Sequence, residues 1–251
     1  MTDTVAILTG ASRGLGAALA RGLLKPGTNL ITLARGNDPE LDASALALGV
    51  PLQQIQVDLA DPAAAQQAAD TISAALPQDA ARYLLINNAG TMQPVALADN
   101  LADGASIAAA FNLNVTAIML LTARFLAATR GLNARRQVLN ISSGAGRNPR
   151  SGWSVYGATK AALDMYTRVV KQEQGEHGAR IVSLAPGIID TDMQAAIRAC
   201  APGNFPALAT FQDFHANGQL ASPAHVAARI FAYLDRDDFG ANEIDDIRHY
   251  D

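Results

Sequence analysis

Short apolar runs alternate with longer Ala- and Leu-rich segments along nearly the whole chain. The apolar runs lie at 5–9, 30–34, 52–58, 83–87, 137–142 and 180–186, and such alternation is typical of repeated βαβ units. Runs such as 5–9 and 83–87 are apolar at both alternating positions, as in strands buried on two faces of a parallel sheet. The pattern predicts an α/β fold with a doubly wound parallel sheet of about seven strands, helices on both faces and a ligand crevice at the strands' carboxyl ends.

The segment 190–222 interrupts this alternation. It gathers Pro202, Gly203, Pro206 and Gly218 and loses the periodic pattern. Long loops in compact domains often act as lids or binding loops. We therefore expect 190–222 to pass over the crevice as a substrate lid.

Composition supports one compact domain over 1–251, with 49% hydrophobic and 17% charged residues. The net charge of −4 and the lack of a basic run argue against a nucleic acid or an anionic membrane as partner. The single cysteine, Cys200, excludes an internal disulfide and favours a reducing compartment. We expect no metal, because no cysteines accompany the histidines and their spacing is not that of ligands: His177, His215, His225 and His249.

No targeting or membrane segment stands out in the sequence. The N-terminus has an acidic residue and only five consecutive apolar residues, too few for a signal peptide. The apolar segment 117–128 is interrupted by Thr122 and Arg124, short of the ~18 uninterrupted apolar residues of a membrane span. We therefore expect a cytoplasmic protein without a membrane partner.

A glycine-rich turn follows the first apolar run. Gly10, Gly14 and Gly16 precede a helical pattern at 17–24. Glycines permit a tight turn and close backbone approach, and a helix N-terminus offers unpaired N–H groups to a pyrophosphate. The alternative is an ordinary loop between a strand and a helix, but the place after the first strand favours a dinucleotide site.

Two arginines bear on the choice of dinucleotide. Arg35 ends the second apolar run, where an acidic residue would favour NAD, and Arg13 lies inside the glycine turn. Two guanidinium groups there would bind a 2′-phosphate through charge-assisted hydrogen bonds. This favours NADPH/NADP+, unless both arginines merely point into solvent.

Polar residues also follow the third and fourth runs. Asp58 ends the third, and Asn87, Asn88, Ala89 and Gly90 follow the fourth. Such groups at strand ends can bind adenine and ribose, or they can cap the next helices.

Tyr156 and Lys160 are four residues apart, which places phenol and ammonium on one face of a helix. A free tyrosine has a pKa near 10, so proton donation at neutral pH needs a shift of roughly 3 units, which a nearby fixed cation favours. The alternative is an ordinary solvated helix face.

Taken in order, these motifs resemble the classical short-chain dehydrogenase/reductase family. The set comprises the glycine turn, the Asn-Asn-Ala-Gly at 87–90, an Asn in the next helix, a Ser thirteen residues before Tyr156 and the Pro-Gly at 186–187. The resemblance covers almost the whole chain and implies a single-domain Rossmann fold. It also implies phosphate contacts from Gly10, Ser12, Arg13, Gly14 and Leu15, adenine contacts from Asp58 and Leu59, ribose contacts from 87–90, and nicotinamide contacts from Pro186, Gly187, Ile188 and Thr191.

The resemblance further implies the catalytic residues Ser143, Tyr156, Lys160 and Asn114. Ser143 is preferred to Ser142 by its distance from Tyr156, and Asn114 to Asn112 because Ala117 and Thr122 then match the family pattern. Ser143 and Tyr156 would bind the substrate carbonyl oxygen and Tyr156 would give the proton. Lys160 would lower the pKa of Tyr156 and bind the nicotinamide ribose, while Asn114 would hold a water that links Lys160 to solvent.

Within the family, the segments 141–170 and 185–194 look most like the benzil reductase branch, which is related to sepiapterin reductases. Those enzymes reduce one carbonyl of a 1,2-dicarbonyl compound with NADPH. The substrate wall we expect is apolar and contains Trp153, Met193, Phe205, Phe211 and Phe214, although such residues also serve packing alone. The alternatives are another substrate, such as a pterin side chain, a steroid or an acyl thioester, or a non-catalytic nucleotide-sensing scaffold.

Two further expectations concern the rest of the chain. The C-terminal segment 239–251 lacks the glycine pair that many family members carry, which leaves its packing open. The helical segments 105–130 and 156–173 are apolar beyond one face, which fits the family habit of pairing these helices in a homodimer or homotetramer.

Overall fold

Seven parallel strands form one sheet in the computed structural model, which describes residues 3–250. The sheet order is β3-β2-β1-β4-β5-β6-β7, and its strands are β1 (Thr4–Thr9), β2 (Thr28–Ala34), β3 (Leu52–Gln56), β4 (Arg82–Asn87), β5 (Arg135–Ile141), β6 (Arg180–Ala185) and β7 (Ile244–Asp246). The six strands expected from the apolar runs are confirmed, and the short β7 is added to them. The chain order reverses between β1 and β4, where a doubly wound sheet places its ligand crevice.

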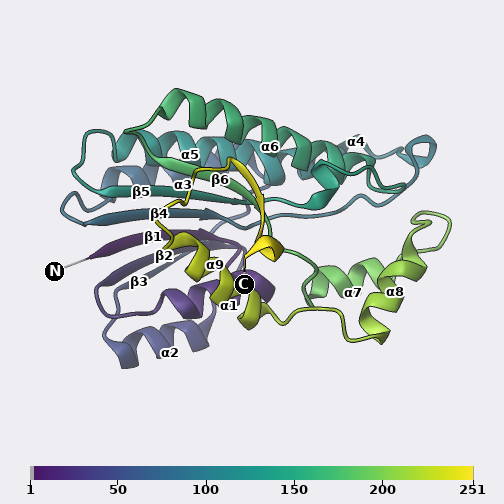
Figure 1. Cartoon of the computed structure of the whole chain (residues 1–251), viewed down its shortest axis with the longest axis horizontal. Helices are drawn as coiled ribbons and strands as arrows, with labels where there is room; N and C mark the ends of the chain where they lie inside the picture. The colour runs from purple at the N-terminus through teal and green to yellow at the C-terminus, as the bar shows by residue number, and fades with distance from the viewer. Residues whose placement is uncertain (1–2, 251) are drawn as a thin grey trace.

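Helices cover both faces of the sheet (Figure 1). One layer contains α1 (Gly14–Leu23), α2 (Pro39–Leu48) and α9 (Pro223–Leu234). The other contains α3 (Pro62–Ala75), α5 (Ala117–Ala128) and α6 (Ser154–Gln174). The predicted doubly wound α/β domain is thus confirmed.

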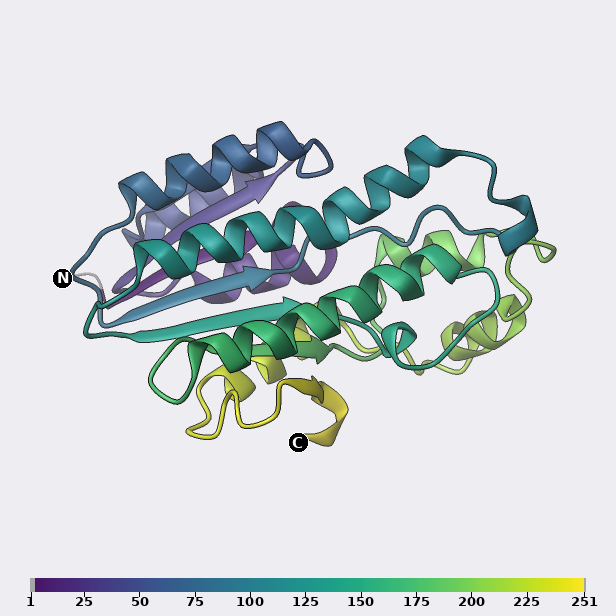
Figure 2. The same ribbon diagram turned by 90° about the horizontal axis from the view of Figure 1, so that it is seen from above.

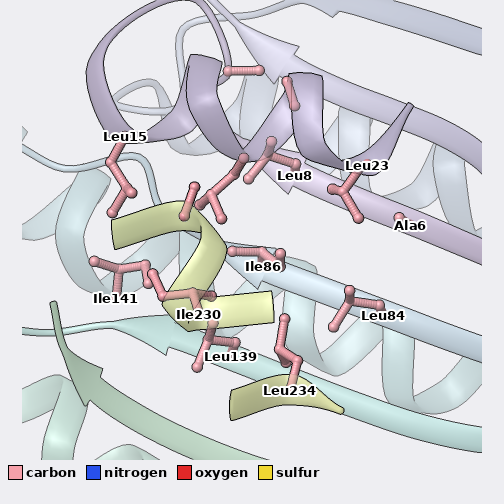
Figure 3. Packing of buried hydrophobic residues seen from close by; sticks show 14 of the residues in the cluster. Ala6, Leu8, Leu15, Leu23, Leu84, Ile86, Leu139, Ile141, Ile230 and Leu234 are labelled. Carbon is pink, nitrogen blue, oxygen red and sulfur yellow. The ribbon is translucent and has the colours of Figure 1, made fainter. Parts of the chain in front are cut away.

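Successive side chains of each strand point to opposite faces of the sheet and pack into two separate cores. Ala6 and Leu8 of β1 face the layer of α1 and α9, while Val5 and Ile7 face the layer of α3 and α5. Figure 3 shows Ile230 and Leu234 of α9 next to Leu139, in the same cluster as Leu84 and Ile86. Strands buried on both faces explain why the runs read as continuously apolar.

Three helices begin in the same way, with a polar capping residue followed by proline. The side chains of Asp38, Asp61 and Ser222 each accept a hydrogen bond from a backbone N–H in the first turn. Proline at the next position removes one N–H that has no partner within the helix and fixes φ in the helical range. These residues determine where α2, α3 and α9 begin.

One long helix contains a wider turn. The helix runs through α4 (Gly104–Phe111), a π-helical turn (Asn112–Thr116) and α5, and the N–H of Ala117 bonds to the carbonyl of Asn112. The extra residue in this turn shifts the side chains that follow it on the helix face.

By length and composition, this continuous helix of 104–128 could cross a membrane, and among the described residues it is the one that could. The sequence analysis considered only the apolar segment 117–128, whereas the helix also includes 104–116. One face of α5 packs as a core helix does, because Ala117, Leu121 and Phe125 are buried with α3 and the sheet. Only 28% of the most apolar window of 104–128 is buried, however.

The segment 190–222 leaves the sheet and returns to it. Hydrogen bonds between Ala221 and the backbone of Ile188 and Asp190 close its stem at 3.0 and 2.9 Å. Between these ends it forms α7 (Asp192–Arg198) and α8 (Leu208–Ala216), which project beyond the carboxyl edge of the sheet (Figure 1). The expected excursion is present, but it contains two short helices where the sequence indicated a loop.

The C-terminal segment is packed in spite of the missing glycine pair. β7 pairs with β6 in parallel, and the buried carboxylate of Asp245 accepts hydrogen bonds from the hydroxyls of Tyr233, at 2.9 Å, and Tyr250. The tyrosine pair thus takes over the anchoring of the C-terminal end.

Candidate active site

The turn after β1 requires glycine at two positions, because a side chain there would be strained or would clash with the backbone. Gly10 has φ of +71°, and a Cβ on Gly16 would lie 1.9 Å from the Gly10 carbonyl oxygen. The N-terminus of α1 receives no side-chain cap from Arg13. Its first N–H groups can therefore bind an anion, so the residues present fit a dinucleotide pyrophosphate.

The predicted phosphate-binding arginines lie near this turn. Arg35 is exposed directly after β2. Arg13 is also exposed and forms an ion pair with Asp192 at the start of α7, 3.4 Å apart. Thr191 lies beside the same turn, since a Cβ on Gly14 would be 3.2 Å from its methyl group.

Two of the predicted ribose residues serve the fold through their side chains. The Asn88 amide donates to the carbonyls of Thr9 and Gly10, at 3.0 and 3.2 Å. Asn87 is buried and donates to Asn140, at 2.8 Å, and to Thr122. Their side chains therefore tie β1 to β4 and β4 to β5.

The remaining cofactor candidates lie along the same edge of the sheet. Asp58 is exposed two residues after β3, and its carboxylate accepts from the N–H of Ala60 at 2.9 Å, next to the buried Leu59. Pro186 to Ile188 follow β6 and are half-buried, and Gly187 has φ of +80°. Both groups thus follow the carboxyl ends of strands.

Tyr156, Lys160 and Ser143 come together at the start of α6. The Lys160 ammonium lies 5.8 Å from the centre of the Tyr156 ring and donates to the Ile141 carbonyl at 2.8 Å. Ser143 is the second residue after β5, and a side-chain hydrogen bond with it acts to lower the pKa of Tyr156. A Cβ on Gly146 would lie 2.8 Å from the backbone of Lys160, so this loop is pressed against α6.

Burial opposes the charged form of both residues. It raises the pKa of the Tyr156 phenol, and the hydrogen bond with Ser143 partly opposes this rise. Burial lowers the pKa of Lys160 to about 8, and the carboxylate of Asp164 counteracts this effect. Ser143 and Asp164 thus act on the pair in the direction that favours charge.

Asn114 sits in the π-helical turn and is fully buried. Its amide donates to the Thr91 carbonyl and the Thr159 hydroxyl, at 2.7 and 3.0 Å, and its carbonyl accepts from the Thr91 N–H at 2.8 Å. A Cβ on Gly90 would lie 3.3 Å from the Asn114 oxygen and 3.7 Å from the Lys160 nitrogen. Glycine at this position keeps both atoms facing the same small space.

An aromatic cluster borders Tyr156 on the side of α7 and α8. Trp153 stacks on Phe205 with ring centres 4.9 Å apart. It forms edge-to-face pairs with Tyr156 and Phe211, with ring centres 5.4 and 5.3 Å apart. Phe214 contacts Phe211 at the edge of this cluster. Met193 is not part of the cluster and is 38% exposed, which sets it apart from the other predicted wall residues.

The family model for short chain dehydrogenases matches residues 4–201. The chain belongs to the short-chain dehydrogenase family. It is therefore an oxidoreductase that acts on CH–OH or C=O groups and uses a nicotinamide cofactor.

Named relatives of this short-chain dehydrogenase cover nearly its whole length. It is 35% identical to benzil reductase ((S)-benzoin forming) of Bacillus cereus over 241 residues, which cover 95% of this chain and 96% of the relative. It is 36% identical to sepiapterin reductase of Rattus norvegicus, with 94% and 92% covered. A short chain dehydrogenase from Burkholderia cenocepacia solved in complex with NADP is 26% identical, with a TM-score of 0.71 and 96% and 94% covered.

Some site residues of this short-chain dehydrogenase were missed from the sequence. Thr91 and Thr159 hold Asn114, and Met92 and Val95 pack with Trp153 in the aromatic cluster. The place of Thr159 in the site could have been inferred from the sequence, because it lies three residues after Tyr156 on the same helix face. Met92 and Val95 carried no such signal, because only the path of the chain after β4 brings them to the lid.

Proposed function

We propose that this short-chain dehydrogenase uses NADPH to reduce one carbonyl of a small 1,2-dicarbonyl compound, such as a benzil-like diketone, to the hydroxy ketone. The observation that carries the proposal is the aromatic cluster of Trp153, Phe205 and Phe211 directly beside Tyr156. Aromatic walls suit an aryl or alkyl diketone. The benzil reductase relative supports the same substrate class.

The buried indole of Trp153 favours a substrate that has a second carbonyl group. Its indole N–H is buried and has no hydrogen-bond acceptor in the described part of the chain. A buried donor without an acceptor costs about 1–3 kcal/mol, which a substrate oxygen can relieve. In a 1,2-dicarbonyl, one oxygen would bind Ser143 and Tyr156 while the other accepts from Trp153.

The chain's own residues divide the work of the reaction. The bound nicotinamide supplies the hydride. Ser143 and Tyr156 donate hydrogen bonds to the substrate oxygen and stabilise the negative charge that develops on it. Tyr156 then transfers its proton, and the ammonium of Lys160 favours the phenolate that remains.

The choice of NADPH rests on the positive charge near the glycine turn. Arg13 and Arg35 are both exposed at the edge where an adenosine 2′-phosphate would lie. We expect Arg35→Ala to raise the KM for NADPH at least about tenfold with little effect on NADH. A tenfold preference of the wild type for NADH in kcat/KM would overturn this choice.

A panel of carbonyl substrates followed at 340 nm tests the proposed reaction. We expect turnover of vicinal diketones and loss of more than nine-tenths of kcat in Tyr156→Phe, with unchanged thermal stability. Failure on every vicinal diketone would reject the substrate class. Tight NADPH binding without turnover of any carbonyl would instead indicate a nucleotide-sensing scaffold.

A second candidate is a pterin side-chain carbonyl, because the sepiapterin reductase relative matches nearly as much of the chain. Sepiapterin in the same panel separates the two, since the better substrate has the higher kcat/KM. A preference for sepiapterin of more than tenfold would favour the second candidate.

We also propose that the protein is a cytoplasmic homo-oligomer. The outer faces of α4, α5 and α6 support the assembly, since four large apolar side chains are exposed there: Phe111, Met119, Met165 and Val169. The single cysteine supports a reducing compartment.

A further inference from the structure

We propose that a charge pair, the buried Asp164 with the partly exposed Arg147, sets the charge of the active-site ammonium at Lys160. Asp164 acts as a positioning residue behind the catalytic residues and has no contact with the substrate. This inference rests on the role of Lys160 given in the proposed function.

Asp164 lies one helical turn after Lys160 on α6 and its side chain is only 7% exposed. One carboxylate oxygen accepts hydrogen bonds from the hydroxyls of Ser142 and Ser183, both at 2.6 Å. The other oxygen lies 3.3 Å from the Nε of Arg147. Because Ser142 follows β5 and Ser183 belongs to β6, the carboxylate is fixed between the ends of two strands and the catalytic helix.

The surroundings of Lys160 make this carboxylate important. The ammonium is buried, and its recorded hydrogen-bond acceptor, the Ile141 carbonyl, carries no net charge. Burial lowers the pKa of Lys160 to about 8, and Asp164 is the group that works against this change. Charges interact more strongly in a buried site than in water, so a carboxylate one turn away can act on Lys160.

The other charged and titratable groups around the pair come from three elements. α6 contributes Tyr156 next to Lys160. The loop after β5 contributes Arg147, whose side chain also donates to the Asp245 backbone carbonyl of β7 at 3.5 Å. The Asp245 carboxylate is itself engaged by Tyr233, Tyr250 and His249. Because Arg147 carries the opposite charge, we expect it to oppose the effect of Asp164 on Lys160.

The two members of the pair thus act on Lys160 with opposite sign. Without the negative charge of Asp164, Lys160 loses its proton at lower pH. Without the positive charge of Arg147, Asp164 acts unopposed and Lys160 keeps its proton to higher pH. A purely structural link between strands and helix predicts loss of stability in both variants and no such opposition.

The test measures the titration of Lys160 directly in the cofactor-free protein by NMR with 13C-labelled lysine ε-carbons. The chain has only three lysines, so Lys25→Arg and Lys171→Arg assign the signals. We expect Asp164→Asn to lower the pKa of Lys160 by at least about half a unit and Arg147→Gln to raise it by a similar amount. Asn keeps the size of Asp and can still accept from both serines.

The control is Asp70→Asn, which removes a carboxylate from the exposed ion pair of Asp70 with Arg124 on α3 and α5. We expect no shift of the Lys160 titration in this variant. Equal shifts in Asp70→Asn and Asp164→Asn would mean that net charge alone is responsible, and would overturn the proposal.

The pH profile of carbonyl reduction supplies the second readout. The alkaline fall of kcat/KM should move to lower pH in Asp164→Asn and to higher pH in Arg147→Gln. Opposite NMR shifts without any turnover would support the charge pair and reject the proposed reaction. Unchanged or same-direction shifts would reject the charge pair whatever the turnover. If Asp164→Asn fails to fold, Arg147→Gln decides alone, since an unchanged or lower pKa of Lys160 overturns the proposal.

Discussion

At the scale of single residues, the catalytic pair is held where burial disfavours its charge. Tyr156 and Lys160 face each other on α6, as the four-residue spacing predicts, but burial raises the pKa of the phenol and lowers that of the ammonium. The sequence indicated only the attraction between the two. The cost of burial comes from the strands and the lid that pack around them.

The lowered pKa of Lys160 predicts the pH dependence of the reaction. Below pH about 8 the ammonium is charged and favours the tyrosinate; above it the charge is lost. We therefore expect kcat/KM for reduction to be level near neutrality and to fall above about pH 8. Steady-state rates between pH 6 and 10 at saturating cofactor test this. An alkaline fall that begins only near pH 10 would show that Lys160 keeps its ordinary pKa.

The glycine turn allows a prediction with a matched control. In Gly16→Ala the new methyl would meet the Gly10 carbonyl oxygen at 1.9 Å, so the turn and α1 must separate. We expect at least about tenfold weaker NADPH binding, because the N–H groups of α1 then miss the pyrophosphate. Titration of NADPH fluorescence measures the affinity. Gly104→Ala, where a Cβ has no neighbour within 4 Å, should leave binding unchanged and stability equal or higher by up to about 1 kcal/mol.

At the scale of elements, the sequence predicts the strands better than the segments between them. The runs 5–9 and 83–87 become β1 and β4 because both faces of those strands are buried. α7 and α8 escaped the periodic pattern because few of their residues meet a core; Gln194 and Ile197 are the buried residues of α7. β7 is three residues long, too short for a pattern, and depends on pairing with β6.

In the active site too, the sequence predicts contacts within one element better than contacts between elements. Tyr156 and Lys160 could be paired from sequence because they share one helix. The contacts of Asn114 with Thr91 and Thr159 could not, because a π-helical turn determines where its side chain points. Asp164 also escaped notice, although it follows Lys160 by one turn, because its serine partners belong to two different strands.

A buried hydrogen-bond network joins β4, β5 and α6 through Asn140. Asn140 of β5 accepts from Asn87 of β4 at 2.8 Å and donates to Thr167 of α6 at 2.9 Å, and all three side chains are buried. Asn140→Ala leaves both partners without this contact. We expect a loss of about 2–4 kcal/mol in the free energy of unfolding, measured by urea titration.

The control for this prediction is Gln66→Ala, which removes an exposed hydrogen bond to Asp70 on α3. It should change the free energy of unfolding by less than about 0.5 kcal/mol. A loss in Asn140→Ala as small as in Gln66→Ala would show that the link from β4 to α6 contributes no stability.

At the scale of the whole molecule, the side formed by α4, α5 and α6 exposes large apolar side chains to solvent. α4 and α5 form a long apolar helix of which little is buried, and α6 lies beside it (Figure 2). Phe111, Met119, Met165 and Val169 are exposed on these helices. Exposed apolar side chains on neighbouring helices are what the proposed assembly needs, and none of the four belongs to the aromatic cluster.

The assembly is therefore testable through Met165, which is 56% exposed on α6. In Met165→Asp a second copy packed on this face would bury an unpaired carboxylate, at a cost that shifts the equilibrium toward monomers. We expect light scattering after size exclusion to give a dimer or tetramer for the wild type and a smaller species for Met165→Asp. Leu46→Asp is the matched control, because Leu46 is 85% exposed on α2, in the layer on the opposite face of the sheet. Dissociation by Leu46→Asp alone would place the interface on the other face, and a monomeric wild type at micromolar concentration would rule out the assembly.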